Sequence, residues 1–262
     1  MPHYSPFLAI LLGLLVGSFL NVVICRLPLG QSIVVPRSHC PQCGRFIPWY
    51  DNIPLISFLL LVGSCRFCQK KISWQYPLVE LVTGLLSFLT FLKFGSLTAS
   101  LLYFLLLVCP LIAITFIDFH HKIIPGVISL SGIPVGLIVS LLVFGISWKT
   151  LNYSLLGILT GGGALFLVSW IYEKTRKREG LGMGDVKLTA MLGAFFGWKG
   201  VFFVLLMSSM IGSIVGLVLI LIYRKGLQYA IPFGPFLAAA ALLYLYFGPE
   251  LITFYLSLTQ RA

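Results

Sequence analysis

Acidic residues are scarce in this sequence: seven Asp and Glu stand against 18 Lys and Arg, and charged residues make up only 10% of the 262 positions. Apolar residues make up 59%, and the mean hydropathy is +1.02. A water-soluble domain of this length cannot bury so much apolar surface, so a soluble globular protein is excluded. The sequence therefore predicts a protein whose main solvent is lipid.

Charge is absent from long stretches of the chain. Six stretches contain no Asp, Glu, Lys or Arg, namely 4–25, 94–117, 123–148, 150–172, 200–223 and 226–249, and a seventh, 77–96, contains only Glu80 and Lys93. Each reaches roughly the 20 residues that a membrane-spanning helix needs. The run 188–198 is shorter but can span obliquely. None shows the alternation of a β-barrel, so we predict an all-α polytopic membrane protein with about eight transmembrane helices.

The distribution of basic residues predicts the orientation. No basic residue precedes the first span, so we expect a retained span rather than a cleavable signal peptide, and Arg26 directly after it places the N-terminus outside. Fourteen of the 18 Lys and Arg then fall in the loops predicted to be cytoplasmic, near 26–76, 118–122, 173–187 and 224–229. We interpret the basic run EKTRKRE at 173–179 as a topology anchor on anionic lipid. Nucleic-acid binding is disfavoured, because no folded basic surface accompanies the run.

The chain divides into a first span (1–25), a polar cytoplasmic insert (26–76) and a core of seven further helices (77–262). The small residues of GILTGGGA at 157–164 indicate close helix packing. They lack the strand–turn–helix context of a nucleotide-binding loop.

Two cysteine pairs lie in the insert, CPQC at 40–43 and CRFC at 65–68. The pattern C-x2-C-x21-C-x2-C is typical of a structural zinc site with ligands Cys40, Cys43, Cys65 and Cys68, and Gly44 suits a tight turn at the metal. A redox-active dithiol pair and plain packing are the alternatives, although a cytoplasmic location disfavours lasting disulfides. His39 is a possible substitute ligand, and Cys25 and Cys109 are expected to pack in apolar surroundings. We expect the apolar segment 52–64 to lie against the membrane surface.

Only three aspartates are present. Asp51, in the insert, is expected to be a solvated turn residue. Asp118 closes one predicted span and Asp185 opens another, both at the cytoplasmic end. Two carboxylates at one depth suggest aspartyl-protease chemistry, in which the pair shares one proton and activates a water molecule. Gly182 and Gly184, just before Asp185, would let a substrate backbone approach.

Structural roles for the same residues remain open. Asp185 could stabilise a helix N-terminus, and Asp118 could pair with Lys122 one turn later. His120 and His121 are interpreted as polar residues of the membrane interface.

Several blocks occur in a characteristic order: GSFLNVVICRLP (17–28), the two CxxC pairs, YPLVELVTG (76–84), IDFHHKIIP (117–125) and GMGDVKL (182–188). Together they resemble the type IV prepilin peptidases, a GxGD-type family of membrane aspartyl proteases. The resemblance implies cleavage of the basic leader of prepilins and pseudopilins at the cytoplasmic face of the bacterial inner membrane, with Asp118 and Asp185 as the catalytic pair.

The resemblance also implies N-methylation of the new N-terminus, with S-adenosylmethionine as the methyl donor. Asn21, Glu80 and Gly84 lie in the matching blocks and are the candidates for binding this cofactor. Glu80 has a structural alternative, since a carboxylate in the first turn of a helix is favoured by the helix dipole. Two other functions are weighed: a GxGD protease without methyl transfer, and a metal-dependent transporter or sensor, which would need polar residues at mid-membrane.

Overall fold

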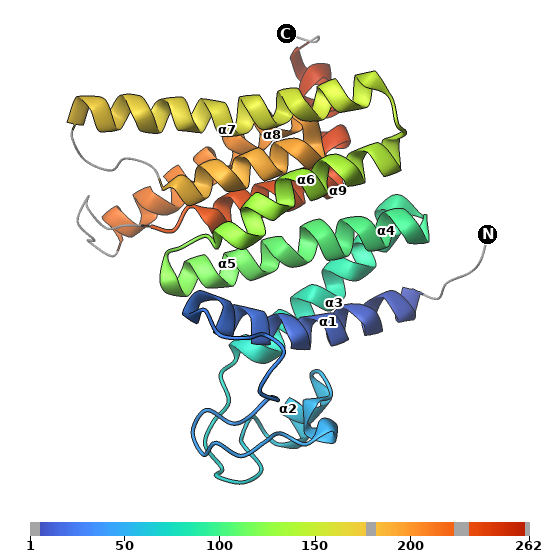
Figure 1. The fold of residues 1–262 in the computed structure, drawn as a ribbon, viewed down its shortest axis with the longest axis vertical. Helices are drawn as coiled ribbons and strands as arrows, with labels where there is room; N and C mark the ends of the chain where they lie inside the picture. The colour runs from blue at the N-terminus through green and yellow to red at the C-terminus, as the bar shows by residue number, and fades with distance from the viewer. Residues whose placement is uncertain (1–5, 177–181, 223–230, 260–262) are drawn as a thin grey trace. The chain divides into compact units, whose positions relative to one another are not determined.

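The computed structural model describes residues 6–176, 182–222 and 231–259, and within them the chain is helical, without strands. Residues 177–179 of the EKTRKRE run lie outside this part of the chain. The elements, in chain order (Figure 1), are α1 (Pro6–Arg26), η1 (Leu27–Leu29), η2 (Trp49–Asn52), α2 (Ile56–Leu60), α3 (Gln75–Phe94), α4 (Leu97–Tyr103), the π-helical η3 (Phe104–Val108), α5 (Cys109–His121), α6 (Gly126–Phe144), α7 (Trp148–Arg176), α8 (Met183–Leu221) and α9 (Gly234–Thr259).

Among the described residues, six helical stretches are long and apolar enough to cross a membrane. They are Pro6–Leu29, Gln75–Phe94, Leu97–His121, Gly126–Phe144, Trp148–Thr175 and Met183–Leu221, and a shorter apolar helix covers Gly234–Gly248. These stretches confirm the prediction of a polytopic helical membrane protein.

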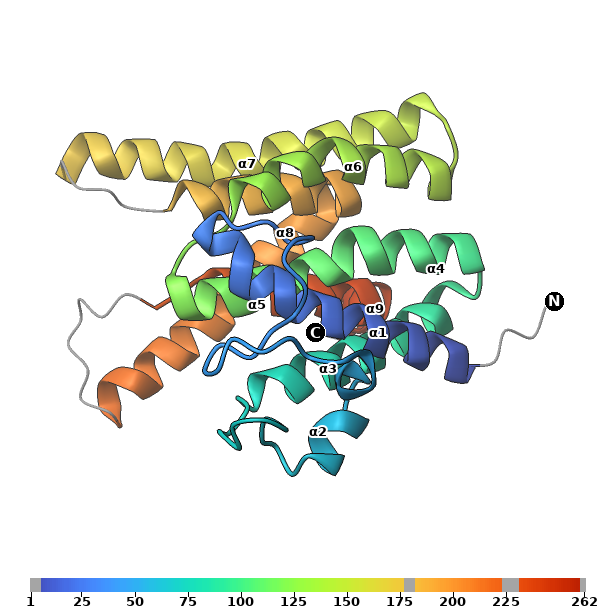
Figure 2. The ribbon, with the colours of Figure 1, turned by 60° about the horizontal axis from the view of Figure 1, so that its bottom comes forward.

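The helix α8 accounts for two of the predicted spans. Gly197, with φ 68° and ψ −178°, breaks its helical geometry, and the expected spans 188–198 and 200–223 lie on either side of this break. The ribbon turns back at this break, so the two halves of α8 run in roughly opposite directions, and the helix begins and ends at the same end of the bundle that it forms with α6 and α7 (Figures 1 and 2). Counting both halves of α8 together with α9, the described residues contain about the eight hydrophobic segments that we expected.

The helix α9 begins later than the predicted span 226–249, at Gly234. Proline supplies the reason. Pro232 precedes the helix and Pro235 lies in its first turn, and a proline is tolerated only where no intrahelical N–H bond is needed.

The chain forms two compact units, residues 1–113 and 114–262. In the first, α1 packs against α3 at very close range. A Cβ atom on Gly13 would lie 2.6 Å from Ser87 Cβ, and one on Gly17 would lie 2.8 Å from Glu80 Cα. Ser87 Oγ also donates a 2.7 Å hydrogen bond to the carbonyl of Ala9. Glycine thus lets the two backbones approach, as is common between membrane helices.

In the second unit, α7 and α6 pack along α8, and α9 also packs on α8 (Figure 2). A Cβ on Gly157 would collide with the backbone of Gly193 and Gly197, and one on Gly161 would lie 2.6 Å from the carbonyl oxygen of Thr189. Thr189 Oγ1 donates to the Gly161 carbonyl at 3.3 Å. This confirms close helix packing at GILTGGGA.

Candidate active site and metal centre

The four cysteines of the insert gather in one cluster. The Sγ atoms of Cys40, Cys43, Cys65 and Cys68 all lie within 4.8 Å of one another, and the Cys40 and Cys68 sulfurs are 3.9 Å apart. Zinc–thiolate bonds of about 2.3 Å in a tetrahedron require sulfur–sulfur distances of about 3.8 Å. The donor set and its geometry therefore fit a four-coordinate metal ion.

The two cysteine pairs form equivalent turns. In the first, Cys40 N–H donates to the Arg45 carbonyl and Gly44 N–H donates to the Cys40 carbonyl, both at 2.9 Å. In the second, Cys65 and Gln69 make the same two bonds to Lys70 and Cys65 at the same distances. Each turn places its fifth residue in the left-handed region, Gly44 at φ 69° and Gln69 at φ 57°. The tight turn expected at Gly44 is confirmed, and it occurs twice.

Backbone N–H groups converge on the sulfur atoms of the second turn. The N–H groups of Cys68 and Phe67 donate to Cys65 and lower the pKa of its thiol to about 7. The N–H of Lys70 donates in turn to the sulfur of Cys68, but burial and the neighbouring thiols of Cys65, Cys43 and Cys40 raise the pKa of Cys68 to about 11. The backbone hydrogen bonds favour the thiolate, which is the form that binds a metal, whereas the close approach of the other thiols opposes its charge.

An ion pair braces the second turn. Arg66 Nε and Nη2 donate to Asp51 Oδ2 and Oδ1 at 2.7 and 2.6 Å, and the guanidinium lies 5.4 Å from the centre of the Tyr50 ring. These bonds hold the pKa of Asp51 below its usual value. Asp51 lies in the helical turn η2, as expected of a turn residue, but the expectation that it is solvated was wrong, since its side chain is only 6% exposed.

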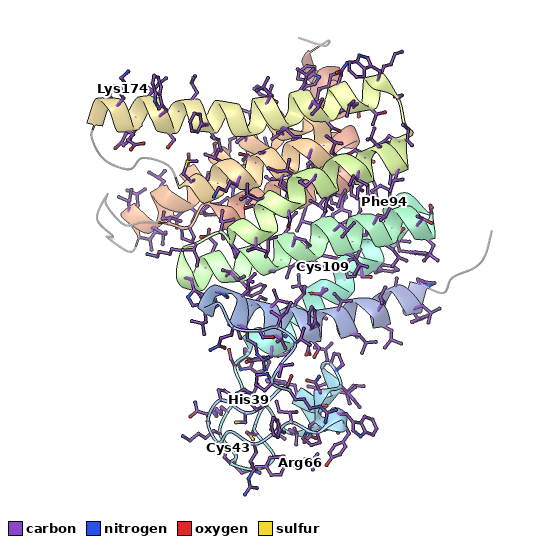
Figure 3. The ribbon with its side chains drawn as sticks, in the orientation of Figure 1. His39, Cys43, Arg66, Phe94, Cys109 and Lys174 are labelled. Atoms are coloured by element: carbon purple, nitrogen blue, oxygen red, sulfur yellow. The ribbon has the colours of Figure 1, made fainter. Side chains whose placement is uncertain are left out.

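The other histidine and cysteine residues considered from the sequence lie outside the four-cysteine cluster. Figure 3 shows His39, Cys43 and Arg66 within the insert, but His39 is outside the cluster of thiols, and its Nδ1 lies 3.2 Å from the Arg37 carbonyl. Cys109 is buried, as expected. Cys25 is exposed, contrary to the expectation of apolar packing, and its sulfur lies 3.7 Å from the Tyr76 hydroxyl.

Asn21, Glu80 and Gly84 lie where α1 and α3 face each other. Asn21 Nδ2 donates to the Tyr76 carbonyl at 3.1 Å, whereas its buried Oδ1 finds no hydrogen-bond partner within residues 6–176, 182–222 and 231–259. Glu80 Oε2 accepts a 2.8 Å bond from Leu55 N–H, which attaches the insert to α3. No acidic residue occupies the first turn of α3, because the helix begins at Gln75, so the helix-dipole alternative for Glu80 was wrong. A Cβ on Gly84 would lie 3.0 Å from Leu14 Cδ2, so this glycine serves helix packing.

The apolar segment of the insert forms α2 and the turn after it. Its side chains Ile56, Leu59, Leu60 and Val62 are all exposed. That this segment lies on the membrane stays a prediction.

Asp118 lies in the last turn of α5 and is only 4% exposed. Its Oδ2 accepts a 2.9 Å hydrogen bond from the backbone N–H of Gly234, the first residue of α9. The peptide chain leaves α5 directly afterwards, where Lys122 closes the helix with a φ of 55° and donates to the Asp118 carbonyl.

Asp185 lies in the first turn of α8, and it is close enough to Asp118 for the two charges to interact. Its Oδ1 is buried and has no hydrogen-bond partner in the part of the chain that the structure describes. Among the described residues, a Cβ on Gly182 would meet only Asp185 Oδ2, at 3.3 Å, so this glycine lies directly beside the carboxyl group. Gly184 differs: its Cβ would lie 2.9 Å from Ile124 Cβ, so the room it leaves is filled by Ile124.

Gly234 and Ile124 were not identified by sequence reasoning. A Cβ on Gly234 would lie 2.7 Å from Asp118 Oδ2 and 3.3 Å from Ile124 Cδ1, so the same isoleucine fills the space at both Gly184 and Gly234. The available signal was a glycine between two prolines, PFGP at 232–235, at the start of an alanine-rich apolar run.

A helical membrane core that brings two aspartates from distant helices together, with a glycine directly beside one carboxyl group, has the arrangement of a membrane aspartyl peptidase. The comparisons with known proteins lead to a narrower assignment. Residues 11–94 match the bacterial Peptidase A24 N-terminal domain, and residues 105–217 match the type IV leader peptidase family. The chain belongs to the type IV leader peptidase family.

Curated relatives carry the name prepilin leader peptidase/N-methyltransferase. The protein from Pseudomonas aeruginosa is 39% identical over 94% of this chain and 92% of its own length, and that from Pseudomonas putida is 38% identical over 95% and 93%. The protein from Myxococcus xanthus is 45% identical over 84% of this chain, which spans 64% of that relative's length. No solved structure matches the chain.

Proposed function

We propose that this chain removes the basic leader of prepilin-like precursors with Asp118 and Asp185 as the catalytic pair, and that it methylates the new N-terminus. The observation that carries the proposal is the meeting of these two carboxyl groups, one from the end of α5 and one from the start of α8, with interacting charges. Membership in the leader peptidase family, whose curated relatives carry both activities in their name, supports it.

The chemistry needs one ionised and one protonated carboxyl group. The ionised one takes a proton from water, whose oxygen attacks the scissile carbonyl carbon, and the protonated one gives its proton to the carbonyl oxygen. When the tetrahedral intermediate collapses, the carbon–nitrogen bond breaks. The leaving amine then receives the proton taken from water, and the second carboxyl group regains its own from a hydroxyl of the intermediate.

Zinc is the proposed ion of the four-cysteine cluster, and its proposed role is to fold the insert. The site offers four thiolates and no open position, which is typical of structural rather than catalytic zinc. The insert has few buried apolar side chains, so binding free energy from a metal would supply stability that it otherwise lacks.

S-adenosylmethionine is the proposed methyl donor, and Asn21 is its proposed contact. The buried, unpartnered Oδ1 of Asn21 is an acceptor that fits a donor group of the cofactor. Glu80 and Gly84 would act indirectly, since Glu80 holds the insert and Gly84 holds the α1–α3 contact. When bound, the cofactor supplies the methyl group for the new amino terminus.

The test uses the purified protein, a synthetic precursor with a basic leader, and mass spectrometry with and without S-adenosylmethionine. We expect Asp118→Asn and Asp185→Asn each to slow leader removal by about 10²-fold or more. Both variants should still methylate a precursor supplied without its leader, which shows that they are folded. Asn21→Ala should raise the KM for S-adenosylmethionine and leave cleavage intact. Undiminished cleavage by either aspartate variant would overturn the catalytic assignment.

A further inference from the structure

The environments of the two aspartates differ. Asp118 Oδ2 accepts a hydrogen bond from the Gly234 backbone N–H at 2.9 Å, whereas Asp185 Oδ1 is buried without a partner among the described residues. A hydrogen bond donated to a carboxylate stabilises its charged form, and a buried carboxylate oxygen without a donor is unfavourable when charged.

The hydrogen bond to Asp118 depends on residue 234 being a glycine, which has no side chain. A Cβ on Gly234 would lie 2.7 Å from Oδ2 and 3.2 Å from Cγ of Asp118, so any larger residue would push the carboxylate away from the N–H. The other side of this position is filled by Ile124, whose Cδ1 would be 3.3 Å from the same Cβ. The added atom therefore has no free direction in which to move.

The helix dipole at the start of α8 also favours a charged Asp185, but this effect is weaker than the hydrogen bond to Asp118. Asp185 lies in the first turn of α8, where the helix dipole favours a negative charge. Such a dipole shifts an equilibrium by a few-fold, whereas a direct hydrogen bond to a charged group shifts it by about tenfold or more. The direct bond therefore decides which of the two groups carries the charge.

We propose that Gly234 is a positioning residue that keeps Asp118 ionised, so that Asp118 is the base and Asp185 holds the shared proton. In the cleavage step Asp118 then removes the proton from water, and the proton of Asp185 passes to the scissile carbonyl oxygen. This inference rests on the proposed function, since it assigns the roles within the same pair. It also makes the start of α9 a third element of the active site, beside the end of α5 and the start of α8.

The first experiment measures cleavage kinetics of Gly234→Ala in the full-length protein with the synthetic precursor. We expect kcat to fall by about tenfold or more with KM within about twofold, because the substrate contacts remain and the base is displaced. Methylation of a precursor supplied without its leader should equal that of the wild type. The matched control is Gly216→Ala in α8, where the one described atom within 4 Å of a Cβ would be Ile231 Cδ1, at 3.8 Å, and cleavage should be normal.

The second experiment does not depend on the folding of Gly234→Ala. Infrared spectra of the two aspartate variants report the C=O stretch of a protonated carboxyl group. We expect Asp185→Asn to lose a band that Asp118→Asn retains, because the proton belongs to Asp185. The reverse pattern would overturn the role assignment, and wild-type kcat in Gly234→Ala would overturn the role of Gly234. Neither result would touch the proposed function, which fails only if the aspartate variants still cleave.

Discussion

Gly44 and Gln69 occupy the same position in the two equivalent turns of the metal cluster, and both have a positive φ. Only glycine adopts this conformation without penalty, and for other residues it is unfavourable by roughly 1–2 kcal/mol. No atom of the described residues lies within 4 Å of a Cβ built on Gly44, so a substitution there changes backbone strain alone. We expect Gly44→Ala to weaken zinc binding by roughly fivefold to thirtyfold, and Gln69→Gly to strengthen it.

The measurement is a competition titration with a chromogenic chelator, after metal analysis of the purified protein. The control is Cys25→Ser, which lies outside the cluster and should change neither metal content nor affinity. Active protein without bound zinc would remove the assignment of the metal. Equal affinities of the wild type and Gly44→Ala would mean that the turns do not limit binding.

Which side chains come together was predictable where their chemistry is rare in the sequence, whereas the catalytic and metal-binding roles of these residues stay predictions. Asp118, Asp185 and the four cysteines stand out because a lipid-facing chain keeps few ionisable groups and few thiols in pairs. The role of Gly234 was not predictable, because it acts through a backbone N–H that every residue except proline carries. Arg66 was equally hidden, since a basic residue between two cysteines gives no sign of the aspartate it will meet.

At the scale of helices, the close contact of α7 with α8 depends on glycines at the positions where the two backbones meet. A Cβ on Gly157 would collide with backbone atoms of Gly193 and Gly197, and backbone cannot rotate away as a side chain can. We expect Gly157→Ala to lower the free energy of unfolding by about 1–3 kcal/mol or more. Gly163→Ala, in the same GGG run, would meet only Leu159 Cδ1 at 3.8 Å and should be nearly neutral. Thermal unfolding in detergent compares the two, and equal midpoints would contradict the packing argument.

Hydrophobic runs predicted most helices of this chain, but not how α8 is built. A run without charges shows that a segment prefers lipid, but it does not show whether the chain continues straight or reverses within that segment. The reversal at Gly197 follows from one residue with a positive φ packed on the ring of Tyr153, a tertiary contact that hydropathy does not register. The late start of α9 could have been predicted from Pro232 and Pro235, since proline marks the beginning of a helix.

At the scale of the whole molecule, the number of hydrophobic segments determines which loops share a side of the membrane, and the positions of Lys and Arg predict which side that is. With about eight crossings, the distribution of Lys and Arg predicts that the insert and the carboxyl pair face the same side of the membrane, the side on which the basic loops are expected.

The last prediction concerns this orientation. Gln31, in the insert, should face the cytoplasm, and Ile146, an exposed residue between α6 and α7, should face outward. In a Cys25→Ser background, a membrane-impermeant maleimide should label Ile146→Cys in intact cells, and Gln31→Cys only after permeabilisation. The background variant without an added cysteine corrects for labelling of the cluster. Labelling of Gln31→Cys alone in intact cells would invert the topology and place the carboxyl pair on the outer face, where a cytoplasmic leader could not reach it.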